Sequence, residues 1–221
     1  VEKELRENKV NPNKIAYLAF TNQAADEALS RAISQLNYNT KDFMNFRTLH
    51  SLAYRELHLK EENIMSDNDY NFLSNKLQIK LSNPNKNVKA YGTSFPDDVF
   101  MQVIDGAKVR GLTTENFFND PSIGHLPGGI LKLKYIDEAL IKYKRARNKY
   151  DMTDMIVDFN QKHYDTMPNF DVVIIDEAQD LSWLQWKMVE RIVTNAKRVY
   201  VAGDDDQAIY RWAGARPEYL M

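Results

Sequence analysis

The sequence predicts an α/β fold, in which a parallel sheet is flanked by helices and carries an inserted α-helical subdomain. Short apolar runs alternate with amphipathic segments near both ends of the chain, and such alternation is typical of parallel sheets. Between about Lys60 and Lys149 the sequence contains little sign of a strand. We therefore expect a discontinuous core domain, residues 1–57 and 150–221, and a helical insertion over residues 58–149.

The first predicted elements are a strand and a helix. The run KIAYLAF, Lys14–Phe20, is short and mostly apolar, which suits a strand buried on both faces. Thr21 or Asn22 can cap the helix that follows. A second short strand is expected at Phe43–Phe46, followed by a helix from about Thr48. The first helix is predicted from apolar residues that recur at spacings of three and four: Ala25, Ala28, Leu29, Ala32, Ile33 and Leu36.

The middle of the chain is predicted to contain loops and helices. An Asn/Pro-rich loop spans Leu81–Asn87, and a Gly-rich loop spans Gly124–Gly129 without the Lys-Ser/Thr pair of a phosphate-binding loop. Between Lys132 and Lys149, five Lys and two Arg outnumber Asp137 and Glu138. A solvated helix face is the ordinary explanation of such an excess of positive charge, and contact with nucleic acid is the alternative.

The last part of the chain returns to alternating elements. A helix is expected over Met152–Tyr164, and continuous apolar strands are expected at Asp171–Ile175 and Arg198–Gly203. Trp183 and Trp186 are assigned to packing. The helix between the two strands is predicted from one apolar face: Leu184, Met188, Val189 and Ile192.

Composition excludes several classes of protein. The chain has 29 Lys plus Arg against 31 Asp plus Glu, so a polyanionic partner has to be bound by a local patch. It has no Cys, which excludes disulfides, Fe–S clusters and cysteine zinc sites, and its four His lack metal-ligand spacing. No apolar run approaches the roughly 20 residues that span a bilayer, and no signal segment opens the chain, so we expect a soluble intracellular protein without a membrane partner.

Polar clusters follow three of the predicted strands, at Ala19–Gln23, Ile174–Asp180 and Val201–Gln207. Ligands of open α/β sheets bind outside the carboxyl ends of the strands, so these clusters can converge on one site. Each cluster alone can also be a helix cap or a turn. Four apolar residues followed by Asp176 and Glu177 are typical of a strand tip that presents one carboxylate to Mg²⁺ and a second to a water molecule.

Four blocks of the sequence together resemble motifs Ia, Ib, II and III of the superfamily 1 DNA helicases of the UvrD/Rep type. In order, the blocks are Tyr17–Leu29, Phe46–Leu57, Val172–Asp180 and Val201–Ala215, and Tyr150–Phe159 is similar to the segment that usually precedes motif II. The predicted insertion matches that family by position only. The resemblance implies a RecA-like core domain and the cofactors ATP and Mg²⁺.

The resemblance also implies roles for individual residues. Asp176 would hold Mg²⁺, Glu177 would be the general base for the attacking water, and Gln207 would sense the γ-phosphate. Single-stranded DNA is the implied partner, and stacking on an aromatic face gives every base about 1–3 kcal/mol whatever its identity. His50 has a helix-terminus role as its alternative. The residues implied to contact DNA are Phe20, Thr21, Asn22, Thr48, His50, Tyr210 and Trp212.

The sequence departs from the family pattern in two ways. It contains no G-x-x-x-x-G-K-[ST] run, whose backbone amides and Lys would hold the ATP phosphates. It has Ala213 where the family usually has Arg. Whatever that Arg contributes in the family has to be weaker in this chain or come from Arg211 or Arg216. We expect a fragment truncated at both ends, which lacks the second RecA-like domain.

The expected function is that of a fragment of an ATP-dependent DNA helicase or translocase. It would move 3′ to 5′ on single-stranded DNA, meet junctions of single and double strands, and serve DNA repair or replication. The expected location is the cytoplasm of a bacterium or phage-infected cell, or a eukaryotic nucleus. Without the phosphate loop, the fragment alone is expected to be inactive. One alternative is a non-catalytic module that binds single-stranded DNA, and another is an ordinary α/β domain with DEAQD by chance, which leaves the aromatic residues of motif III unexplained.

Overall fold

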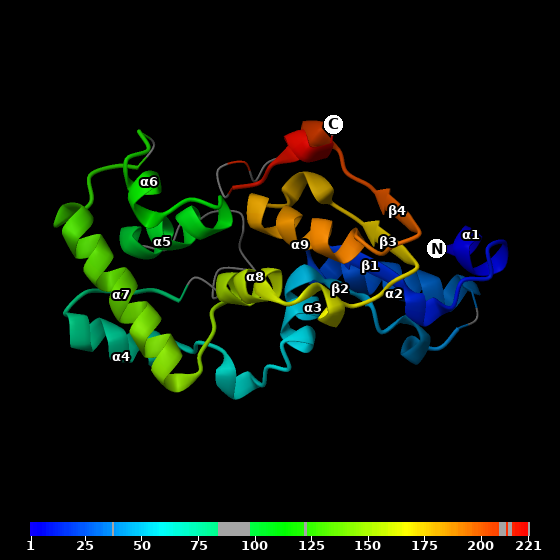
Figure 1. The fold of residues 1–221 in the computed structure, drawn as a ribbon, viewed down its shortest axis with the longest axis horizontal. Coiled ribbons are helices and arrows are strands. Elements are labelled where there is room, and N and C mark those ends of the chain that lie inside the picture. The colour runs from blue at the N-terminus through cyan, green and yellow to red at the C-terminus, as the bar shows by residue number, and fades with distance from the viewer. Residues whose placement is uncertain (37, 84–97, 122, 208–210, 212–213, 221) are drawn as a thin grey trace. The chain divides into compact units, whose positions relative to one another are not determined.

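The structure is a computed structural model that describes residues 1–36, 38–83, 98–121, 123–207, 211 and 214–220 (Figure 1). The chain divides into two compact units. The first unit combines Val1–His58 with Ile156–Met221, and the second comprises Leu59–Met155. The second division falls after Met155, later in the chain than the boundary expected at residue 150, because the residues just before it have their partners in the second unit.

The first unit is built on a four-stranded parallel sheet in the order β2-β1-β3-β4. The strands are β1 (Ile15–Ala19), β2 (Phe46–Thr48), β3 (Val172–Ile175) and β4 (Arg198–Val201). In the register of β1, Leu18 lies opposite Arg47 of β2 and Ile175 of β3. The prediction of an α/β fold with a parallel sheet is confirmed.

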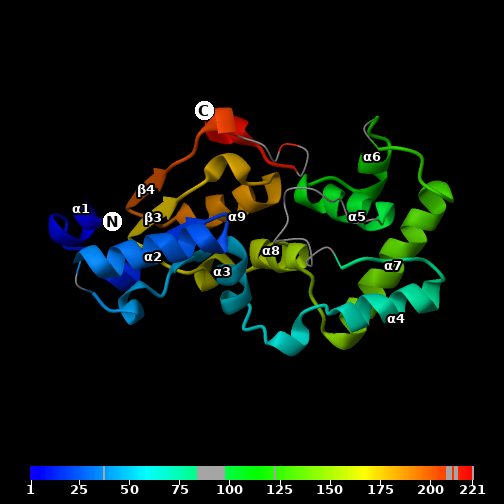
Figure 2. The ribbon, with the colours of Figure 1, turned by 180° about the vertical axis from the view of Figure 1, so that it is seen from behind.

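Helices cover both faces of this sheet. They are α1 (Glu2–Arg6), α2 (Asn22–Leu36), α3 (Leu49–Glu56) and α9 (Trp183–Val193). Figures 1 and 2, seen from opposite sides, show α2 on one face and α9 on the other. Because strand residues alternate between faces, Ile15 and Tyr17 of β1 share the face of α2 with Val172 and Ile174 of β3. The core on this face also contains Ala32, Phe43 and Phe46.

The second strand was expected in the wrong place. The structure begins β2 at Phe46 and places Phe43 in a 3-10 helix, Thr40–Phe43. The side chain of Asp42 accepts a hydrogen bond from the backbone N–H of Asn39 at 2.9 Å, which closes this turn. Phe43 lies outside the strand but still packs in the core, where its ring centroid is 4.8 Å from that of Phe46. An apolar residue at this position therefore does not indicate a strand.

The outer strand β4 is unusually exposed for a parallel sheet. Val199, Tyr200 and Val201 are 42%, 43% and 48% exposed, whereas strands of parallel sheets are normally buried on both faces. Tyr200 of β4 donates a hydrogen bond at 2.6 Å to the carboxylate of Glu4 in α1, and the same carboxylate pairs with Arg198, the first residue of β4, at 2.6 Å. This short helix therefore fastens the N-terminal segment to β4.

Within the described residues, the regular secondary structure of the second unit is helical, apart from one isolated bridge between Ile64 and Tyr150. Its helices are α4 (Asp67–Leu77), α5 (Val99–Val109), α6 (Thr114–Phe118) and α7 (Gly129–Arg147). Its core joins α4, α5 and α7 through Tyr70, Leu73, Ile104, Leu133, Ile136 and Leu140. Helix α8 (Met152–Gln161) begins in this unit and ends in the first, and it stops before the expected Tyr164.

One cation of the basic segment is buried, against the expectation of a solvated face. The ammonium of Lys144 in α7 pairs with Asp151, and also with Asp154 at 2.7 Å. Lys108 of α5 pairs with Asp154 at 3.0 Å, and burial together with the charge of Asp151 raises the pKa of Asp105 to about 7. Lys144 therefore stabilises the packing of the second unit and is not available on its surface.

Among the residues that the structure describes, no helix is both long enough and apolar enough to cross a membrane.

Candidate active site at the carboxyl edge of the sheet

The three polar clusters lie at the same edge of the sheet. Strands β1, β3 and β4 are neighbours and parallel, with Leu18 opposite Ile175 and Ile175 opposite Val201. The residues that follow each strand therefore emerge side by side. The structure brings together Thr21 after β1 and the Asp176–Glu177 pair after β3.

Asp176 is held by hydrogen bonds to both oxygens of its carboxylate. The backbone N–H of Glu177 donates to Oδ1 at 3.0 Å, and the hydroxyl of Tyr17 donates to Oδ2. The backbone N–H of Asp176 donates to the carbonyl of Leu18 at 2.9 Å and so extends the pairing of β1 with β3. Burial and the bond to Asp176 raise the pKa of Tyr17, so this hydroxyl keeps its proton to donate.

Glu177 has a backbone conformation that is rare for a residue with a side chain. Its φ of 53° and ψ of 38° lie in the left-handed region, which costs on the order of 1–3 kcal/mol outside glycine and is common at functional sites. The turn is fixed by Ala178, whose N–H donates to Ala202 at 3.0 Å. The strained turn thus directs the Glu177 side chain toward the start of α2, where Thr21 donates to its Oε2 at 3.3 Å.

Thr21 connects this carboxylate to α2. Its hydroxyl oxygen accepts a hydrogen bond from the N–H of Ala24 at 3.2 Å, so Thr21 is the helix cap and Asn22 is the first helical residue. The same hydroxyl donates to Glu177. Thr21, which the sequence assigned to the DNA track, therefore contacts the predicted general base.

A second link joins the ends of β3 and β4. The side-chain oxygen of Gln179 accepts from the N–H of Asp204 at 3.1 Å, and the carboxylate of Asp204 accepts a hydrogen bond from the amide of Gln207. Gln207 is exposed in a 3-10 helix, Asp205–Gln207. Gln179 and Asp204 lie inside the predicted clusters, but no role was predicted for either of them, because their contact depends on β3 and β4 being neighbours.

Asp180 is a further carboxylate of this edge that sequence reasoning left without a role. Its Oδ1 atom is buried and has no hydrogen-bond partner within the described part of the chain. Burial raises the pKa of Asp180 to about 6, and the charge of Glu177 adds to the rise. Burial and the neighbouring Glu177 carboxylate thus both make ionisation of Asp180 less favourable than that of an exposed aspartate.

The other predicted DNA contacts lie in different surroundings. Thr48 is buried, and its hydroxyl accepts from the N–H of Ser51 at 3.2 Å, which caps α3. His50 lies in the first turn of α3 and is half-buried, as is Phe20 after β1, while Asn22 is exposed. The predicted DNA contacts Tyr210 and Trp212 and the departure at Ala213 lie outside the described residues.

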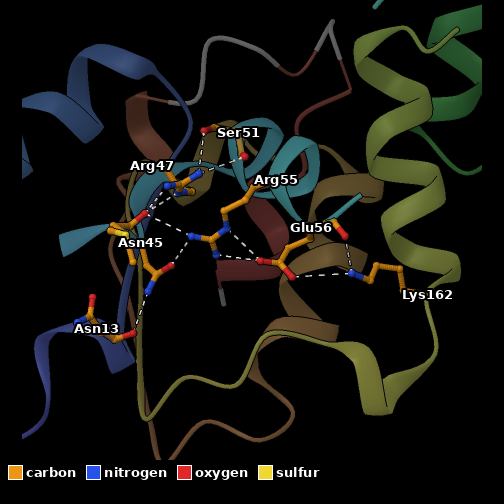
Figure 3. A network of polar contacts seen from close by, with 8 residues as sticks. Asn13, Asn45, Arg47, Ser51, Arg55, Glu56 and Lys162 are labelled. Atoms are coloured by element: carbon orange, nitrogen blue, oxygen red, sulfur yellow. Dashed lines mark hydrogen bonds and ion pairs between the residues drawn. The ribbon is translucent and has the colours of Figure 1, made fainter. Parts of the chain in front are cut away.

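A polar network joins β2 and α3, the two elements to which Thr48 and His50 belong (Figure 3). Arg55 of α3 donates to Asn45 at 2.8 Å and to Glu56 at 2.9 Å, and Asn45 donates to the backbone of Asn13 at 2.9 Å. Lys162 donates to the carbonyl of Glu56 at 2.7 Å. Arg47 also points into this network, with bonds to Met44 at 2.8 Å and Ser51 at 3.4 Å, so these cations serve the fold.

The carboxylate oxygens at this edge fit a magnesium ion whose other ligands are phosphate oxygens and water. Among the described residues, no group of three or more His, Asp or Glu side chains could hold a metal by itself. Mg²⁺ is commonly bound by one or two carboxylates together with phosphate oxygens and water, and Asp176 beside Glu177 suits that role. The 221 residues supply these carboxylates but contain no phosphate-loop sequence.

The parallel sheet and the carboxylate pair at its carboxyl edge define a RecA-like α/β domain. The chain belongs to the UvrD/REP helicase N-terminal domain family, whose family model matches residues 1–221.

Relatives of known name agree with this membership. The chain is 25% identical to the "Probable DNA helicase II homolog" of Mycoplasma genitalium over 96% of its own length and 31% of that protein. It is 25% identical to "DNA helicase II" of Escherichia coli, over 96% of this chain and 30% of the relative. It is 23% identical to "ATP-dependent DNA helicase Rep" of Buchnera aphidicola, over 93% and 31%. The chain thus spans about a third of the length of these relatives.

Proposed function

We propose that this chain is the part of an ATP-dependent DNA helicase that hydrolyses the nucleotide and contacts single-stranded DNA. The observation that carries the proposal is the hydrogen bond from Thr21 to Glu177 at 3.3 Å, beside Asp176 at the carboxyl edge of the sheet. It joins a residue of the predicted DNA track to the predicted general base. Movement of the whole protein from 3′ to 5′ follows from the resemblance and belongs to the same proposal.

Three residues at this edge have a proposed task in hydrolysis. Mg²⁺ bound with ATP would neutralise charge on the phosphates. Asp176 would hold that ion, Glu177 would take the proton of the attacking water, and Gln207 would contact the γ-phosphate. The network from Gln207 through Asp204 to Gln179 supports a coupling between the end of β4 and the turn that carries Glu177.

DNA would be bound beside this edge. Phe20, Asn22 and His50 are accessible enough to contact a strand, whereas Thr48 would contribute through its backbone because its hydroxyl caps α3. Tyr210 and Trp212 complete the proposed track as stacking platforms. We further propose that the first compact unit is the core domain and that the second is the insertion, which would meet the junction of single and double strands.

The proposal is tested by Glu177→Gln in the full-length gene product. Loss of the general base should lower DNA-stimulated ATP hydrolysis by at least about 100-fold and leave nucleotide binding largely intact. Steady-state ATPase assays and equilibrium binding of a fluorescent nucleotide measure the two effects. Glu190→Gln is the matched control, because Glu190 is exposed on α9 and pairs only with Lys187 at 2.7 Å in the described structure. Equal turnover in Glu177→Gln and wild type would contradict the assignment.

A non-catalytic module that binds single-stranded DNA is the second candidate. It is favoured by one observation, the lack of a G-x-x-x-x-G-K-[ST] run in the 221 residues. The same assays separate the two candidates. A full-length product that binds DNA but shows no ATP hydrolysis would establish the module and exclude the helicase.

A further inference from the structure

Tyr17 is the one residue in the strand β1 that carries a polar group on its side chain. It lies opposite Ile174 of β3, and Asp176 follows two residues later on the same side of that strand. This diagonal places the phenol hydroxyl against the Asp176 carboxylate, to which it donates a hydrogen bond. A tyrosine in the middle of a buried strand thus reaches the edge where the site is formed.

The ring of Tyr17 is fixed from its other side. It stacks on Phe46 of β2 with centroids 5.3 Å apart and an interplanar angle of 15°. Phe46 packs in turn on Phe43 at 4.8 Å, and Phe43 meets Tyr38 edge-on at 5.5 Å. This row of four aromatic rings restricts rotation of the Tyr17 side chain, so its hydroxyl is held in one position.

We propose that Tyr17 is a positioning residue, whose hydroxyl holds the Asp176 carboxylate in one orientation for binding Mg²⁺. The inference rests on the proposed function, in which Asp176 is the metal ligand. With the N–H of Glu177 on Oδ1 and the hydroxyl of Tyr17 on Oδ2, rotation of the carboxylate breaks one bond or both. Hydrogen bonds of this kind to a ligating carboxylate typically contribute 10- to 100-fold to metal affinity or activity.

The hydroxyl can be removed without disturbing the ring. Tyr17→Phe keeps the stack on Phe46 and the burial of the ring, and it deletes only the bond to Asp176. In the full-length gene product, binding of Mn²⁺ in the presence of a non-hydrolysable ATP analogue is measured by electron paramagnetic resonance. We expect Mn²⁺ to bind about 10- to 100-fold more weakly. The Mg²⁺ concentration for half-maximal ATPase should rise similarly, while the rate at saturating Mg²⁺ stays close to that of wild type.

Tyr200→Phe is the matched control. It deletes the same atom from β4, another strand of the same sheet, where the hydroxyl donates to the carboxylate of Glu4 at 2.6 Å. Mn²⁺ affinity should be unchanged in this variant. Weakening equal to that of Tyr17→Phe would overturn the inference, because it would trace the effect to general loss of stability.

Asp176→Asn separates this inference from the function on which it rests. If Asp176→Asn weakens Mn²⁺ binding and Tyr17→Phe does not, Tyr17 has no positioning role and the proposed function stands. If neither variant changes Mn²⁺ binding, the assignment of the metal to Asp176 fails, and the inference fails with it.

Discussion

At the scale of single residues, the site is defined by side chains that do two things at once. The Thr21 hydroxyl caps α2 and donates to Glu177, and the Tyr17 ring packs in the core while its hydroxyl bonds to Asp176. Loss of one atom at such a position therefore changes both stability and chemistry. The two effects have to be separated by variants that keep one contact and delete the other.

Thr21→Val and Thr21→Ser make this separation at the start of α2. Valine keeps the shape but removes the cap and the bond to Glu177, so the free energy of unfolding should fall by about 1 kcal/mol and ATPase activity should fall as well. Serine keeps both bonds and should stay near wild type. Urea unfolding and ATPase assays of the full-length product test this. Identical behaviour of the two variants would show that the hydroxyl is not used.

The sequence predicts candidate site residues where the signal lies in adjacent positions, and it does not predict contacts between residues that are far apart in the chain. Asp176 and Glu177 are predicted from the sequence because an apolar run ends directly before them, and they remain a prediction. Tyr17 was missed, since its contact with Asp176 spans 159 positions and depends on β1 lying next to β3. Thr48 was assigned to DNA from the resemblance, yet its hydroxyl caps α3, which a spacing pattern does not reveal.

At the scale of elements, apolar runs predict which segments form strands better than they predict where each strand begins and ends. The predicted strands near Lys14–Phe20 and Asp171–Ile175 formed, because continuous apolar runs are what a parallel sheet buries. The strand near Arg198–Gly203 also formed, although it is exposed at the outer edge of the sheet. Phe43 failed as a strand residue, since a phenylalanine packs equally well from a 3-10 turn. Lys144 failed as a surface residue, because the partners that bury it, Asp151 and Asp154, come from beyond the end of α7.

Because Lys144 is buried, we expect the removal of its side chain to cost a large part of the free energy of unfolding. Lys144→Ala should lower the free energy of unfolding of the second unit by about 3–5 kcal/mol, because it removes the nearest cation from the buried Asp151 carboxylate and leaves Lys108, at 3.9 Å, to pair with it. Lys142→Ala, on the exposed side of the same helix, removes only a 3.5 Å pair with Glu138 and should cost less than about 0.5 kcal/mol. Urea unfolding and limited proteolysis measure both. Similar losses in the two variants would contradict the burial.

At the scale of the whole molecule, the chain contains the edge of the sheet at which we propose nucleotide hydrolysis, and it spans about a third of its relatives' length. Asp176, Glu177 and the residues that we propose to contact DNA belong to the first unit, and the second unit has a separate helical core. A site that shares its ligands with other segments is expected to act only when those segments are present.

Residues 1–221 alone should therefore hydrolyse ATP far more slowly than typical enzymes, below about 1 s⁻¹, with or without single-stranded DNA. The reason is that Asp176 and Glu177 can act only on phosphates that a cradle holds, and the 221 residues contain no such sequence. A steady-state ATPase assay of the purified chain measures this, with the full-length product as reference. Turnover of 1 s⁻¹ or more would show that another segment of the chain binds the phosphates.

The exposure of β4 has a practical consequence for anyone who prepares these residues by themselves. Unpaired apolar edge strands are templates for pairing with other copies, and Val199, Tyr200 and Val201 form such an edge in the described sheet. At high concentration, we expect the isolated chain to aggregate under conditions of temperature and denaturant in which it is still folded.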